Sequence, residues 1–114
     1  MCHNKNYFSN IIEITDGDME FVEEVANDLL EMFSEAHMEA LESNIKHKEG
    51  AIVAKKAHKF RSAVVNFNMV KLEKILRELE CFGKNNTLEK TNGIIDNIKF
   101  EIQQFKNTLE KFNK

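Results

Sequence analysis

The sequence contains no proline and only four glycines among its 114 residues, so it offers few sites for tight turns. A sheet of many short strands needs turn signals about every 8–12 residues, and this chain does not have them. Long helices with short connections remain the favoured class of structure. A chain of this length corresponds to one domain, so we expect residues 1–114 to form a single unit around one core.

Hydrophobic residues recur at helical spacing along most of the chain. The clearest series runs over residues 88–112, where the apolar positions alternate in steps of three and four, as in a bundle seam. The same spacing predicts a short helix over 7–14 and longer helices over 18–45, 49–67 and 69–83. Asn68 marks the turn between two of these helices, and Gly83 marks a helix stop. Short links place neighbouring helices antiparallel, so we predict an all-α, up-down four-helix bundle with a short additional N-terminal helix.

The charge is distributed unevenly. Residues 13–42 carry eleven acidic side chains and no Lys or Arg, whereas residues 46–61 carry six basic side chains against one acid. Nucleic-acid binding usually needs a wider basic footprint without a strongly acidic neighbour, so we expect no nucleic-acid partner. The basic segment has two interpretations at this point, a solvated helix face or a site for an anionic group.

The sequence also limits the cellular setting. It has no apolar run of about 18 residues, and its start lacks the apolar stretch of a signal peptide, so we expect no membrane association. Cys2 and Cys81 lie far apart in the chain and are interpreted as reduced thiols of a cytoplasmic protein.

Several self-contained chemistries lack their residues here. There is no Glu-x-x-His pair for a metal bundle and no glycine-rich loop for a nucleotide phosphate. Ser62 follows His58 by four residues, but neither a third orienting acid nor a glycine elbow accompanies it. We therefore predict that the chain is not an enzyme and holds no metal or other cofactor of its own.

His58 is the remaining candidate, because it lies within the basic segment. A neutral imidazole is a nucleophile near pH 7, since its pKa is about 6.5. The planar N–H groups of Arg61 suit phosphate oxygens, and Lys55 and Lys59 add positive potential. The residues alone leave two interpretations open: a structural histidine at the edge of the core, or a carrier of phosphoryl groups.

Two further residues share the helix face of His58. Ser62 and Val65 lie four and seven positions after it, which places all three side chains on one side of a helix. Ser62 is small enough to let a partner approach the imidazole, and Val65 would offer an apolar docking contact.

The segment Ala57–Ala63, read with Asn66–Asn68 and with Leu79-Glu80, resembles the motif of histidine-containing phosphotransfer (HPt) domains. That motif is roughly A-H-x-L-K-G-S/A, followed by a polar residue, an apolar residue, a glycine and an apolar helix that ends in L-E. This sequence departs from it at three positions, with Arg61 for Lys, Ser62 for Gly and Asn68 for Gly.

The resemblance implies that His58 accepts a phosphoryl group at Nε2, that Arg61 and Lys59 stabilise the phosphoryl oxygens, and that Glu80 accepts a hydrogen bond from His58 Nδ1. It implies a monomer that works with a response-regulator receiver domain and a hybrid sensor histidine kinase, in a two-component phosphorelay. The Mg²⁺ of such a relay would belong to the receiver. The alternative is an HPt-like helical adaptor that binds a receiver domain or a helix without phosphotransfer, which the serine at position 62 keeps open. A histidine-kinase dimerisation module fits less well, because an ATP-binding domain normally follows it.

Overall fold

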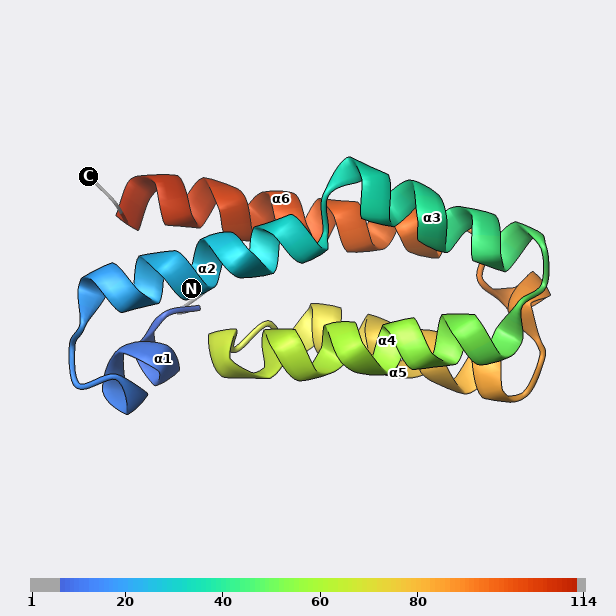
Figure 1. The fold of residues 1–114 in the computed structure, drawn as a ribbon, viewed down its shortest axis with the longest axis horizontal. Coiled ribbons are helices and arrows are strands. Elements are labelled where there is room, and N and C mark those ends of the chain that lie inside the picture. The colour runs from blue at the N-terminus through green and yellow to red at the C-terminus, as the bar shows by residue number, and fades with distance from the viewer. Residues whose placement is uncertain (1–6, 113–114) are drawn as a thin grey trace.

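The computed structural model describes residues 7–112, and every regular element in this range is helical (Figure 1). Cys2 and His3 lie outside the described residues. In chain order, the elements are α1 (Ser9–Ile14), α2 (Met19–Met32), α3 (Glu35–Lys46), α4 (Gly50–Val64), the 3₁₀ turn η1 (Val65–Phe67), α5 (Val70–Lys84), the 3₁₀ turn η2 (Leu88–Lys90) and α6 (Ile94–Phe112).

The helices form two layers (Figure 1). Helices α4 and α5 pack antiparallel as a close pair, and α2, α3 and α6 cover one side of this pair. Apolar side chains from all of these helices meet in one buried cluster between the layers. Burial of these side chains supplies the main driving force for the fold. The largest side chains that are almost fully buried are Met38, Leu41, Phe67, Leu72, Leu76, Leu79, Ile98 and Phe105.

The predicted continuous helix over residues 18–45 is wrong, because it breaks between α2 and α3. Ser34 caps the start of α3, where its side chain accepts a hydrogen bond from the His37 backbone N–H. Phe33 is buried just before the cap, and its ring centroid lies 4.7 Å from that of Phe60 on α4. The break lets the Phe33 side chain reach the core. After it, α3 begins with its side chains rotated about the helix axis relative to those of α2. The all-α class of the prediction is confirmed within residues 7–112, but the predicted up-down four-helix bundle is not.

The last predicted helix begins later than its apolar spacing indicates. Leu88 and Thr91 are buried as the seam requires, but they belong to η2 and its following loop. Gly93 adopts a φ of +79°, which an α-helix cannot contain, and α6 starts at Ile94. Within residues 7–112, neither this 19-residue helix nor any other has the combination of length and apolar character that a membrane crossing requires.

The connection between α4 and α5 follows the prediction. Asn68 has φ 54° and ψ 34°, the left-handed conformation that ends η1 and allows α5 to reverse direction. The predicted stop at Gly83 is wrong, because α5 continues through Lys84 and Gly83 has no positive φ. Gly83 instead lies against Gly50 and Ala54 of α4. This contact sets the close approach of α4 and α5, the two helices that carry the candidate site.

Candidate functional site

His58 lies on the outer face of α4, at the edge of the buried stripe. Ala57 and Phe60 point into the core, and the helical rotation between them leaves His58 outside it. Its side chain is 60 % exposed. One side of the ring faces α5, while most of its surface is open to an approaching molecule.

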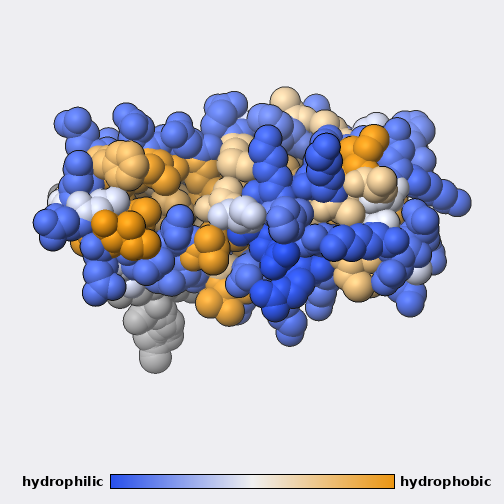
Figure 2. All heavy atoms as spheres, turned by 60° about the horizontal axis from the view of Figure 1, so that its bottom comes forward, coloured by the Kyte–Doolittle hydropathy of each residue, from blue (hydrophilic) through white to orange (hydrophobic). Residues whose placement is uncertain are grey.

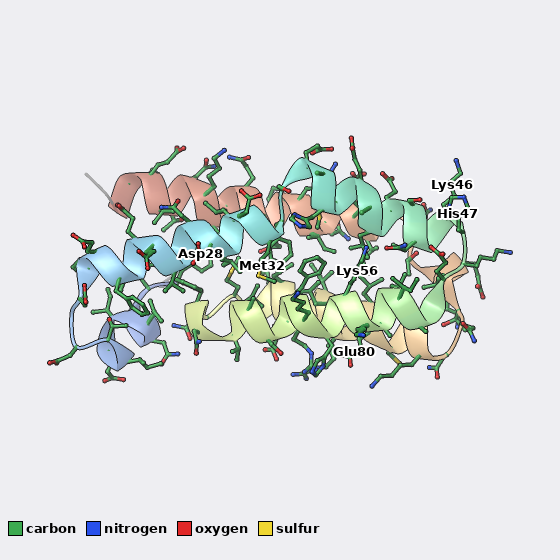
Figure 3. All side chains as sticks on the ribbon, in the orientation of Figure 1. Asp28, Met32, Lys46, His47, Lys56 and Glu80 are labelled. Atoms are coloured by element: carbon green, nitrogen blue, oxygen red, sulfur yellow. The ribbon has the colours of Figure 1, made fainter. Side chains whose placement is uncertain are left out.

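Glu80 of α5 is the buried polar centre of the site (Figure 3). Its side chain is only 10 % exposed, yet three polar groups surround its carboxylate. Arg61 donates from Nη2 to Oε1 at 3.0 Å, and Lys84 donates from Nζ to Oε2 at 3.2 Å. His58 Nδ1 lies 3.3 Å from the same Oε2. This cluster of four residues, His58, Arg61, Glu80 and Lys84, is called the Glu80 cluster below.

The Glu80 cluster keeps its carboxylate ionised. Burial raises the pKa of Glu80, because a charged group loses hydration there. The hydrogen bond from Lys84, the positive charges of Lys84 and Arg61, and His58 when it is protonated act in the opposite direction, and together they hold the pKa of Glu80 below its usual value. A carboxylate with this environment accepts hydrogen bonds at neutral pH and does not donate one.

We expect Glu80→Gln to make stability less sensitive to acid. Because the pKa of Glu80 is lowered in the folded state, its ionised form contributes stability above the unfolded pKa, and this contribution is lost as the pH falls through the folded pKa. The variant should lose about 1–2 kcal/mol at neutral pH through its weakened bonds to charged donors. Urea unfolding at neutral and acid pH measures both effects.

Glu73→Gln provides a matched control on the same helix. Glu73 pairs with Arg77 four residues later at 2.8 Å, and the Arg77 side chain is 65 % exposed. Removing such a surface pair should cost about 0.3–0.5 kcal/mol. Equal acid sensitivity in the parent and in Glu80→Gln would show that the Glu80 carboxylate does not contribute in this way.

The imidazole of His58 has two neighbours of opposite kind at Nδ1. Glu80 Oε2 is an acceptor at 3.3 Å, whereas Arg61 Nη2 is a donor at the same distance. A proton on Nδ1 satisfies Glu80 and leaves the lone pair on Nε2, whereas a proton on Nε2 lets Nδ1 accept from Arg61. The first tautomer matches the ionised carboxylate, and it places the nucleophilic nitrogen on the side of the ring away from Glu80.

The other predicted site residues divide between two sides of α4. Lys55 lines a hollow together with His58, while Lys59 borders a separate hollow with Lys56. Lys56 reaches across to α3, where its Nζ donates to Asn44 at 2.6 Å (Figure 3). Lys59 therefore lies beside His58 in sequence but lines a different hollow.

Ser62 and Val65 are both exposed on the face that carries His58, and Val65 is 54 % exposed. Val70, at the start of α5, is 73 % exposed. Figure 2 shows hydrophilic atoms over the middle of this side of the molecule and apolar surface toward the end where α4 turns into α5. The histidine thus has charged groups on one side along the helix and apolar groups on the other.

Sequence reasoning missed Lys84. It follows Glu80 by four residues on one helix, which is the spacing of a helical ion pair and was the available signal. It also placed Arg61 toward a bound phosphate, whereas in the structure Arg61 donates to Glu80 and its buried Nε has no hydrogen-bond partner within residues 7–112.

Comparison with protein-family models, with curated proteins and with solved structures found no match to this chain. Residues 7–112 contain no group of three or more His, Cys, Asp or Glu side chains placed to bind a metal ion.

Proposed function

We propose that this protein is a histidine phosphotransfer protein, which accepts a phosphoryl group on His58 and passes it between the aspartates of receiver domains. The observation that carries the proposal is the contact between His58 Nδ1 and the buried, ionised Glu80, with the rest of the ring exposed. A nucleophile that works on a partner's phosphoaspartate must be accessible, and its reactive nitrogen must be unprotonated. In this arrangement most of the His58 ring is exposed, and a proton on Nδ1 leaves Nε2 unprotonated.

The overall architecture supports the same proposal. In this interpretation, α2 and α3 together serve as one broken helix of an antiparallel four-helix bundle, with α4, α5 and α6 as the other three. The short α1 packs against η1 at one end. His58 then lies midway along an exposed helix, where the compact receiver of a response regulator has room to dock.

We assign the roles as follows. Glu80 accepts from Nδ1–H and leaves the Nε2 lone pair for attack on phosphorus. Arg61 stabilises the phosphoryl oxygens, for which it has to exchange its bond to Glu80 for one to phosphate. Lys59, which lines a different hollow, contributes positive potential at His58. The receiver partner supplies the acidic cluster and Mg²⁺, so the chain itself needs no cofactor and is no enzyme in the strict sense. A hybrid sensor histidine kinase would supply the phosphoryl group upstream.

The second candidate function is a helical adaptor that binds a receiver domain without accepting phosphate. Ser62 favours it, since its side chain is exposed on the face that carries His58, where HPt domains have glycine. A hydroxymethyl group there narrows the approach of a partner aspartate to the imidazole. Binding through Val65 and its apolar neighbourhood would not require that approach.

The test is incubation of the full chain with ³²P-labelled receiver domains from multistep phosphorelays. We expect label to move from at least one receiver to this chain and to be labile in acid but stable in alkali, as a phosphoramidate bond is. The same receivers are tested for binding by calorimetry, so that transfer and association are measured separately.

A receiver that binds while no tested receiver transfers label would support the adaptor. Label that is stable in acid would place the phosphoryl group on a hydroxyl and contradict the proposal.

A further inference from the structure

Arg61 contacts both the nucleophile and the carboxylate of the Glu80 cluster through one nitrogen. Its Nη2 lies 3.0 Å from Glu80 Oε1 and 3.3 Å from His58 Nδ1. The guanidinium has N–H donors and no acceptor, so it forms a hydrogen bond with Nδ1 only when that nitrogen is unprotonated. A neutral imidazole that accepts at Nδ1 carries its proton on Nε2, the nitrogen that has to be free for phosphoryl transfer. The contact of Arg61 therefore opposes the reactive tautomer.

Glu80 favours the opposite tautomer. Its Oε2 lies 3.3 Å from His58 Nδ1 and attracts a proton on that nitrogen, which leaves the Nε2 lone pair free. The contacts of Glu80 and of Arg61 to Nδ1 have the same length, so distance alone favours neither of them. One nitrogen cannot satisfy a donor and an acceptor at the same time. The balance between the two tautomers therefore depends on where the guanidinium lies.

Arg61 is not held in this position by all of its donors. Its side chain is 27 % exposed, and its buried Nε has no hydrogen-bond partner within residues 7–112. A buried donor without an acceptor costs free energy. A phosphoryl group can accept from Nε and from an Nη nitrogen side by side, in the bidentate geometry that arginine favours. Glu80 would still pair with Lys84 after Arg61 has moved, so its carboxylate keeps a cationic partner.

We propose that Arg61 is a clamp on His58 that a phosphoryl group releases. In the free protein, the guanidinium at Nδ1 holds part of the His58 population in the unreactive tautomer. When the phosphoryl group of a receiver's phosphoaspartate draws the guanidinium away, Nδ1 is left to Glu80 and takes up the proton. The inference rests on the proposed function, because it concerns the same nucleophile and the same donor. It adds a form of regulation, since the histidine becomes fully reactive only beside an anion.

The chemical steps of this release balance. In the change of tautomer, water accepts one proton from Nε2 and supplies another to Nδ1, so the charge of the ring is unchanged. The Nε2 lone pair then attacks phosphorus, the P–O bond to the receiver's aspartate breaks, and the aspartate carboxylate leaves with the electron pair of that bond. The ring becomes positively charged in this step, and its Nδ1–H faces the Glu80 carboxylate once Arg61 has moved away.

The tautomer of His58 can be measured directly. Two-bond ¹H–¹⁵N NMR of the full chain with ¹⁵N-labelled histidine distinguishes a proton on Nδ1 from one on Nε2, at about pH 8.5, where a free imidazole is neutral. His58→Gln assigns the signals. Arg61→Met removes the donors of the clamp and keeps a long apolar side chain. Arg77→Met is the matched control, because it removes an exposed arginine that pairs with Glu73.

Arg61→Met is expected to shift His58 toward the Nδ1–H tautomer. The ratio of the tautomers should change about tenfold, as the loss of one hydrogen bond to a charged group allows. Arg77→Met should leave the ratio unchanged. The direction separates a clamp from a structural role, because an arginine that only held Glu80 in place would, when removed, lower the Nδ1–H population. A lowered or unchanged population in Arg61→Met would overturn the inference.

Release by an anion is tested with sulfate, which resembles a phosphoryl group in shape and charge. Sodium sulfate should raise the Nδ1–H population of the parent above its value in sodium chloride at the same ionic strength, which keeps general screening equal. Arg61→Met should respond equally to the two salts. An equal response of the parent to both salts would also overturn the inference.

These measurements do not depend on phosphoryl transfer, so the two proposals fail separately. If the tautomer responds as expected and no receiver labels the chain, the clamp is supported and the proposed function is contradicted. If receivers label the chain and Arg61→Met leaves the tautomer unchanged, the proposed function is supported and the clamp is contradicted.

Discussion

Replacing His58 with glutamine is expected to abolish phosphoryl acceptance from receiver domains. The glutamine amide has a similar reach and can still donate to Glu80, but its nitrogen lone pair is delocalised and is not a nucleophile. The variant should therefore retain the Glu80 cluster in outline and lose the reaction. Label on the variant should fall to the background of the assay, whereas the parent accumulates it.

The fold should tolerate this change. The His58 side chain is 60 % exposed, and substitutions at such positions usually change stability by less than about 0.5 kcal/mol. Circular dichroism and urea unfolding of His58→Gln measure this directly. His37→Gln and His47→Gln serve as controls, because both histidines are exposed and lie outside the Glu80 cluster, and both variants should label like the parent. Retention of acid-labile label on His58→Gln would move the acceptor to another histidine.

The spacing of apolar residues predicted most of the helices, because the side chains at those positions are the ones that the fold buries. The helix around His58 is found at its expected start, and Asn68 adopts the left-handed turn that its type favours. The spacing from Leu88 onward predicted which residues are buried, but not which of them are helical. A residue can be buried without being part of an α-helix. Here a 3₁₀ turn followed by Gly93 keeps the first residues of the series buried, although they lie outside the last helix.

The sequence around Phe33 and Ser34 contains a local signal for a helix start, but the regular spacing of apolar residues continues across it and predicted one helix. Ser34 followed by Glu35 is a typical helix start, with a capping hydroxyl and an acid in the first turn. The apolar stripe continued through this signal because residues on both sides are buried. The packing of Phe33 against Phe60 shows why a single straight helix could not bury the apolar residues both before and after the break.

The candidate site was predicted in part. The resemblance to the HPt motif predicted a contact between Glu80 and His58 Nδ1, and in the structure a carboxylate oxygen of Glu80 lies 3.3 Å from that nitrogen. The contact of Arg61 to that carboxylate could not be predicted, because it depends on how closely α4 approaches α5. The contact of Lys84 could have been predicted from its spacing of four residues after Glu80 on one helix. Two glycines, one on each helix, allow the close approach of α4 and α5. Whether a glycine does so depends on which residue of the other helix lies opposite it, and the neighbouring residues in sequence do not reveal this.

Gly83→Ala is therefore expected to weaken both the fold and the site. A Cβ at position 83 would lie 2.7 Å from the Gly50 carbonyl oxygen and 2.8 Å from the Ala54 nitrogen. These are backbone atoms of α4, so they cannot swing aside as a flexible side chain would, and the two helices must separate. Alanine gains up to about 1 kcal/mol over glycine in helix propensity, but overpacking of this kind costs about 1–3 kcal/mol and more where backbone must move.

We expect Gly83→Ala to lose about 2 kcal/mol in the free energy of unfolding, measured in urea, whereas Glu78→Ala at an exposed position of the same helix should change it by less than about 0.5 kcal/mol. Separation of the helices should also lengthen the contact between Glu80 and His58, because Glu80 lies one turn before the clash. Phosphoryl acceptance by the folded variant should therefore slow, while Glu78→Ala reacts like the parent. A stable Gly83→Ala protein with unchanged transfer would mean that the close approach of α4 and α5 is not what holds Glu80 against His58.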